Sequence, residues 1–200
     1  IQIVDFIPGV SVVSGWYGKA WIALVTWVAR HLLHVDAPLR ANGSGDAMFD
    51  WVENLCALAL SLLVALAWTA LDRRRTEYTR LYHAWKVYVQ VGLGLVLIVY
   101  GGLKVVPSQF PRPPVSRLLQ PFGDASPMGV LWTFMGASAP YTIFAGFSEL
   151  VPGLLLLFRR TATLGALVAI PVLTNVVMLN YCYDVPVKLF STHLLAIAIY

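Results

Sequence analysis

Two ionisable side chains lie in stretches that are otherwise apolar. Glu149 is the one charged residue between Tyr141 and Phe158, and Lys104 comes three residues before Pro107 at the end of another apolar run. Ionisable residues within membrane segments are rare, usually mark a functional site and take a partner from another helix. We therefore expect Glu149 to be the partner of Lys104 in a helical membrane bundle.

Glu149 allows two interpretations. It lies about eight residues into its expected helix, roughly 12 Å at 1.5 Å per residue, so its carboxylate must be paired, protonated or in contact with a polar cavity. One interpretation is a buried ion pair with a lysine that only fixes how two helices pack. The other is a proton-handling or headgroup-binding site for a quinone or similar amphiphile.

Further polar residues are expected in the same half of the bundle. Lys188 and His193 enter the last apolar run from the same edge, so that they can approach the level of Glu149. Asn175 and Asn180 are suited to hydrogen bonds between helices. The expected ligand-binding residues are Glu149, Lys104, Lys188, His193, Asn180, Asp184, Tyr141 and Gln109, with Asp46 and Asp124 at the same end.

Histidine and cysteine offer two other kinds of chemistry. His31 and His34 share one helical face and precede Asp36, a spacing that can hold a metal ion or simply places imidazoles at a helix end. Cys56 and Cys182 are expected on the same outer side, where a disulfide can persist. The alternative is that both are buried, inert thiols, because free cysteine behaves as a small apolar residue.

The composition predicts a membrane protein. Hydrophobic residues make up 58% of the chain and charged residues 12%, whereas soluble domains carry about 25% charged residues. The net charge of +4 does not come from a basic stripe on a polar surface, so no nucleic-acid partner is expected. No phosphate-binding loop, dinucleotide fingerprint or nucleophilic triad is recognisable.

Six apolar stretches are candidate membrane helices. They cover residues 16–33, 51–71, 88–106, 141–158, 162–183 and the run from 187 onward. The first is bracketed by Lys19 and Arg30, so a re-entrant or surface helix is an alternative there. The last is shorter at Tyr200 than the roughly 20 residues that a crossing needs. Because the chain also begins without methionine, we expect a fragment of a longer protein.

The segment from Pro107 to Pro140 is too long and too apolar for a simple linker. Ser126 and Pro127 form a helix-start signal, a capping residue followed by proline at the first helical position. They predict a short helix over 127–136 that covers the bundle as a lid or partly enters the membrane.

Basic residues predict the orientation. The turns at 73–86 and at Arg159-Arg160 are separated by two crossings and are therefore on one side. The excess of positive charge in short cytoplasmic loops makes that side cytoplasmic. Six crossings then leave the amino terminus inside, and five would leave it outside.

Several motifs together resemble DoxX-like membrane proteins. The run Tyr-Gly-Gly-Leu-Lys-Val-Val-Pro-Ser-Gln-Phe at 100–110 is similar to the glycine–lysine signature that ends the first core helix of that family. Glu149 and the residues through Gly165 resemble the acidic second core helix. Residues 180–195 resemble the start of the last core helix in a longer subgroup, which residues 43–46 and 123–128 also match.

This resemblance implies an all-α polytopic bundle of about six spans. Residues 1–84 would be an N-terminal extension with two membrane helices, and residues 85–200 a DoxX-like four-helix core whose last helix is truncated. The family includes the small subunit of a thiosulfate:quinone oxidoreductase and proteins linked to redox maturation at the membrane. The implied function is a subunit of the bacterial inner (cytoplasmic) membrane that serves a quinone-linked redox process, with quinone as the implied cofactor.

Two other functions are left open by the residues. The chain can be a non-catalytic scaffold or assembly subunit of a larger membrane complex, in which the buried charges only lock helices. It can also be a lipid- or small-molecule-handling protein with the Trp132-containing segment as a lid. The expected partners are the lipid bilayer and either other membrane subunits or a second copy of the chain.

Overall fold

The computed structural model describes residues 10–39, 45–73, 77–106 and 108–200, with the side chains of 10–16 left out. Over these ranges every regular element is helical, which confirms the all-α class. The chain divides into two compact units, residues 1–76 and 77–200. The expected boundary between residues 84 and 85 falls inside a continuous helix, α3 (Thr79–Val105).

The first unit contains α1 (Val10–His31) and α2 (Met48–Leu71). Ala47 precedes α2, and Asp50 in the first turn stabilises this helix start, because its carboxylate accepts a hydrogen bond of 2.8 Å from the backbone N–H of Ala47. The indole N–H of Trp21 donates to the Glu53 carboxylate at 2.7 Å. A small apolar cluster joins the two helices and the segment after α1: Val25, Ala29, Ala37, Phe49, Val52 and Cys56.

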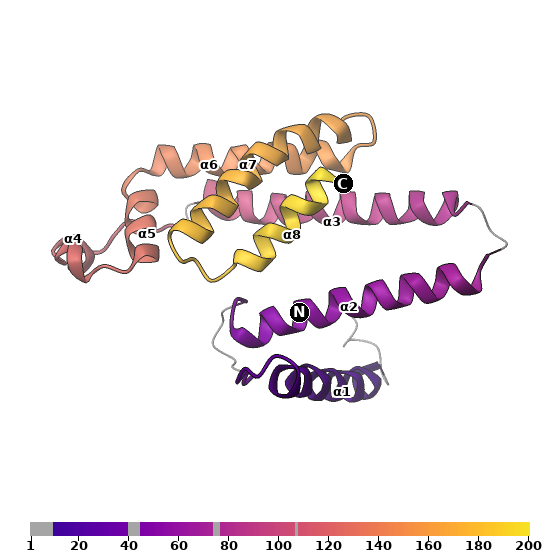
Figure 1. Cartoon of the computed structure of the whole chain (residues 1–200). Coiled ribbons are helices and arrows are strands. Elements are labelled where there is room, and N and C mark those ends of the chain that lie inside the picture. Colours follow the sequence, from indigo (N-terminus) through magenta and orange to yellow (C-terminus); the bar gives the residue numbers. More distant parts are fainter. Residues whose placement is uncertain (1–9, 40–44, 74–76, 107) are drawn as a thin grey trace. The chain divides into compact units, whose positions relative to one another are not determined.

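The second unit holds the remaining elements. After α3 come α4 (Val115–Leu118), the 3₁₀ turn η2 (Phe122–Asp124) and α5 (Pro127–Ala137). Three further helices follow: α6 (Ala139–Leu157), α7 (Ala162–Cys182) and α8 (Lys188–Ile199). Within this unit α5 lies across one end of the α3–α6 pair (Figure 1).

Four helices of the described chain are long and apolar enough to cross a membrane: α2, α3, α6 and α7. The chain is therefore a multi-pass membrane protein, as its composition predicted. The helix over the first expected span, α1, is not among the four, and it carries Lys19 and Arg30. The last, α8, has 12 residues, about 18 Å of helix against the roughly 30 Å of a hydrocarbon core.

Glycines bring α3 and α6 together at two places. Gly94 meets Gly153, and Gly101 meets Gly146, so that the helices run antiparallel. A Cβ on Gly101 would lie 2.6 Å from the backbone nitrogen of Leu150 and 2.7 Å from the carbonyl oxygen of Gly146. Small residues permit this approach of two backbones, which is a common way of packing helices in lipid.

Not every glycine of α3 serves this contact. The same helix carries Gly92 and Gly102, but a Cβ on either residue would meet nothing within 4 Å. The buried residues of each helix recur at intervals of three and four, which marks a single stripe. They are Leu93, Gly94, Leu97, Gly101 and Lys104 on α3, and Thr142, Gly146, Glu149, Pro152, Gly153 and Leu156 on α6.

The short helix after the long loop is confirmed as α5, together with its start signal. The Ser126 hydroxyl accepts a hydrogen bond of 3.1 Å from the backbone N–H of Gly129, and Pro127 occupies the first turn. The rings of Phe110 and Trp132 meet edge to face at 5.0 Å. The Thr142 hydroxyl donates to the Met135 carbonyl oxygen at 2.6 Å. These contacts fix α5 to the loop before it and to α6.

Candidate ligand-binding site

A cavity of about 530 Å³ lies within the second unit, at the end that α5 covers. Small-molecule sites typically measure about 300–1,000 Å³ and combine apolar walls with a few polar groups. Its apolar lining includes Leu97 and Leu173 of one buried cluster and Phe110, Leu131 and Met135 of another. Residues of α3, α5, α6, α7 and α8 all contribute, so that the cavity exists only when the five helices are packed.

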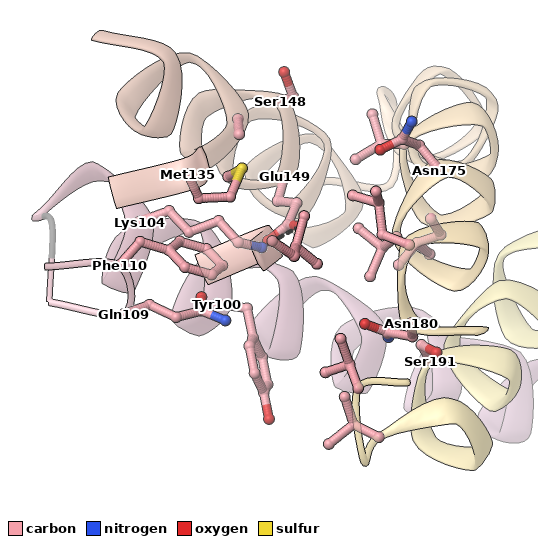
Figure 2. A pocket seen from close by; sticks show the side chains of 18 of the residues that line it. Tyr100, Lys104, Gln109, Phe110, Met135, Ser148, Glu149, Asn175, Asn180 and Ser191 are labelled. Atoms are coloured by element: carbon pink, nitrogen blue, oxygen red, sulfur yellow. Dashed lines mark hydrogen bonds and ion pairs between the residues drawn. The ribbon is translucent and has the colours of Figure 1, made fainter. Parts of the chain in front are cut away.

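Lys104 and Glu149 form an ion pair on the wall of this cavity. The Lys104 ammonium nitrogen is 2.5 Å from Oε1 of Glu149, and the two side chains point toward each other from α3 and α6 (Figure 2). Their exposed fractions are 9% and 5%. Glu149 lies ten residues after Ala139, about 15 Å along the helix axis, so the pair is close to the middle of α6.

Two acceptor atoms on this wall are unsatisfied. In the part of the chain that the structure describes, Oε2 of Glu149 and Oε1 of Gln109 are buried and accept no hydrogen bond. Both residues line the cavity. A buried acceptor without a partner costs about 1–3 kcal/mol, and more when it is charged. The wall around Lys104 and Glu149 therefore favours a bound group that donates hydrogen bonds.

The facing wall is also polar in places. Asn180 is buried on α7 and Ser191 on α8, and the two side chains lie close together across from Glu149, with Asn175 further along α7 (Figure 2). The Ser191 hydroxyl donates to the backbone carbonyl oxygen of Lys188 at 3.0 Å. Polar groups therefore lie on both sides of a mainly apolar space.

Five of the eight expected ligand-binding residues line this cavity: Glu149, Lys104, Gln109, Tyr141 and Asn180. The partner of Glu149 in the structure is Lys104 of α3, which was one of the two lysines expected near it. The other lysine, Lys188, instead makes an ion pair with Asp184 at 2.6 Å, one helical turn away. Neither of these two residues lines the cavity.

His193 and Asp124 are exposed and do not line the cavity either. The reason is helical geometry: Ser191 and Leu194 line the cavity, and a residue two positions after Ser191 is rotated by about 200° around an α-helix. His193 therefore points away from the carboxylate that it was expected to approach. Asp46 belongs to the first unit and is not among the residues that line this cavity.

Several lining residues were not singled out from the sequence. Tyr100 precedes Lys104 by four residues, and the turn-by-turn spacing of a helix places them on one face. Its ring packs against Phe190 of α8 at a centroid distance of 5.8 Å. Ser191 carried no signal, because an isolated serine in an apolar helix has no recognisable pattern.

The other expected chemistry is not assembled by the described residues. No group of three His, Cys, Asp or Glu side chains there is placed to hold a metal ion. The ring of His31 stacks on Trp27 with a centroid distance of 5.2 Å. Neither Cys56 nor Cys182 forms a disulfide, and Cys182 is exposed rather than buried.

Comparison with known proteins identifies a relative but no described activity. No protein-family model matches the chain, and no solved structure matches it significantly. The chain is 38% identical over 109 residues to a Bacillus subtilis (strain 168) protein described as Uncharacterized protein YwoB. The matched region is 54% of this chain and 68% of that relative. This identity and coverage establish that the chain belongs to the same protein family as YwoB of Bacillus subtilis.

Proposed function

We propose that this chain is a DoxX-like subunit of the bacterial inner membrane that serves a quinone-linked redox process and binds the quinone in the cavity of the second unit. The ion pair of Lys104 and Glu149 on the cavity wall is the observation that carries this proposal. Charged side chains inside a membrane bundle are costly and are typically retained where they meet a substrate or a proton.

The shape of the site supports an amphiphilic ligand. The cavity of about 530 Å³ is bounded mainly by aliphatic and aromatic side chains, with the polar groups gathered on two walls. A substituted quinone ring with an apolar tail matches this division, since its ring oxygens need polar partners and its tail needs apolar contact. The six-span arrangement and the DoxX-like core for residues 85–200 are part of the same proposal, as is the bacterial inner membrane.

A scaffold function is the second candidate, and one observation favours it. Lys104 and Glu149 contact each other directly at 2.5 Å, next to the glycine contact of Gly101 with Gly146. An ion pair at that position locks α3 against α6 without any ligand. Under this alternative the exposed apolar surface of α2 would pack against another subunit or a second copy of the chain.

Quinone binding by the purified full chain separates these candidates. The probe is decylubiquinol, the reduced form of a benzoquinone with a ten-carbon tail, used under anaerobic conditions, and the signal is quenching of tryptophan fluorescence, because Trp132 lines the cavity. The test variant is Lys104→Met/Glu149→Met, since apolar residues of similar size often replace a buried ion pair without loss of stability. We expect at least about tenfold weaker binding, the equivalent of one lost hydrogen bond to a charged group.

The matched control is Asp184→Asn/Lys188→Met. It removes a different lysine–carboxylate pair of the same unit, which does not line the cavity. Asparagine suits the positive φ of 52° at Asp184. Equal affinities in all three proteins would exclude the ion pair from binding and leave the scaffold function. Native mass spectrometry of the gently extracted protein adds the third possibility, since a co-purifying phospholipid would indicate lipid handling.

A further inference from the structure

Glu149 carries an acceptor atom that nothing in the described chain satisfies. Its Oε1 accepts from Lys104, whereas its Oε2 is buried and accepts no hydrogen bond from a described residue. The side chain is 5% exposed and lies on the cavity wall. An ionised carboxylate can only accept hydrogen bonds. The group that meets Oε2 inside the cavity must therefore be a donor.

We propose that this wall is an acceptor subsite that selects a hydroxyl-bearing ligand, so that the cavity binds the reduced hydroquinone more tightly than the quinone. The inference rests on the proposed function for the kind of ligand, and it adds which redox form the site prefers. A hydroquinone presents O–H donors where the quinone presents only carbonyl oxygens, while the ring and the tail are nearly the same size.

The quinone is at a disadvantage at this position. Its carbonyl lone pairs would face those of Glu149 Oε2, which is repulsive. It can accept a hydrogen bond from an N–H of the Lys104 ammonium that is not directed at Oε1 of Glu149, because an ammonium has three donors. Oε2 still receives no donor from the quinone. The hydroquinone makes a charge-assisted O–H···O⁻ bond to Oε2 and leaves the ion pair in place.

Gln109 supports the same preference from the loop that follows α3. Its Oε1 is the second buried acceptor without a partner in the described ranges, and the residue lines the same cavity. Rotation of an amide exchanges its acceptor for a donor, whereas a carboxylate has no such freedom. The selectivity therefore depends on Glu149, and Gln109 adds to it.

The test compares three probes with the full chain under anaerobic conditions. They are decylubiquinone, decylubiquinol and the dimethyl ether of that quinol, which keeps the reduced ring but has no O–H. We expect the quinol to bind at least about tenfold more tightly than either of the other two. A tenfold preference raises the two-electron midpoint potential of the bound couple by about 30 mV relative to the free couple.

Variants locate the preference in the subsite. Lys104→Met/Glu149→Met should bring the three affinities within about twofold of one another, while Asp184→Asn/Lys188→Met should keep the full preference. Gln109→Met changes neither member of the ion pair and should reduce the preference partly, which keeps the test valid if the double variant does not fold.

Three results would contradict the inference. Quinone bound as tightly as quinol, or a dimethyl ether bound as tightly as quinol, overturns the donor selectivity and leaves the proposed quinone site intact. Failure of all three probes to bind overturns the proposed function, and this inference with it.

Discussion

The carboxylate of Glu149 lies near the middle of α6 with an ammonium group on one oxygen and no described partner on the other. Water can hydrate such groups at a protein surface, but inside a membrane bundle each must be matched by a protein or ligand atom. The Lys104 side chain satisfies half of this requirement. The remaining oxygen, Oε2, therefore makes this wall of the cavity an acceptor of hydrogen bonds.

Breaking the ion pair from one side should destabilise the protein more than removing it whole. Glu149→Leu leaves the Lys104 ammonium buried without its counterion, and we expect a loss of about 3–5 kcal/mol in the free energy of unfolding. Lys104→Met/Glu149→Met should recover most of that loss. Thermal unfolding in detergent, followed by circular dichroism, measures both. A double variant no more stable than the single one would mean that the pair is not coupled in this way.

At the scale of the helices, the α3–α6 contact positions the site. Gly101 and Gly146 let the two backbones meet, and the residues three positions further along each helix are Lys104 and Glu149. The same stripe that packs the helices therefore carries the ion pair. Gln90 extends this interface toward the other end, where its amide N–H donates to the Leu156 carbonyl oxygen at 2.6 Å.

Two neighbouring glycines provide a direct test of this packing. Gly101→Ala places a Cβ 2.6 Å from the backbone nitrogen of Leu150, so the helices must separate, at a cost of about 1–3 kcal/mol. Gly102→Ala meets nothing within 4 Å and should be neutral or stabilising by up to about 1 kcal/mol, because alanine favours a helix.

The measurement is thermal unfolding of both variants, with decylubiquinone binding as the second readout. We expect Gly101→Ala to weaken binding as well as stability, since the pair and the cavity depend on the helix contact. Equal stability of the two variants would show that α3 and α6 do not meet at these glycines.

At the scale of the whole molecule, the site belongs to one unit. All lining residues lie between Val96 and Leu194, within residues 77–200. The covered end of this unit carries α5, and the opposite end carries the exposed Arg159-Arg160 turn between α6 and α7. From the excess of positive charge in short cytoplasmic loops, we predict that the cavity lies in the outer half of the membrane.

Labelling of single cysteines tests this orientation. In a Cys56→Ser/Cys182→Ser background, Ser116→Cys lies on the exposed α4 and Arg160→Cys in the exposed basic turn. With a membrane-impermeant maleimide and intact bacterial cells, we expect Ser116→Cys to react at once and Arg160→Cys only after permeabilisation. The reverse pattern would place the cavity in the inner half.

Local information in the sequence was enough for the membrane class and for most helix positions. A helix start such as Ser126-Pro127 depends on neighbouring residues alone, and the expected span over 162–183 became α7 over 162–182. One boundary was less accurate, because α3 begins at Thr79, nine residues before the expected start of its apolar run. Polar residues can extend a helix beyond its apolar run, here on the N-terminal side.

The sequence by itself determined that this chain is helical, crosses a membrane and buries a carboxylate near a lysine. The sequence also pointed to Glu149 as the partner of Lys104, a pair that the structure contains. The tertiary structure alone decided that Asp184 takes Lys188 and that His193 faces away. The physical reason is rotation about the helix axis. Packing of the α3–α6 stripe sets that rotation, and it depends on contacts between residues about fifty positions apart in the chain, such as Gly101 with Gly146 and Gly94 with Gly153.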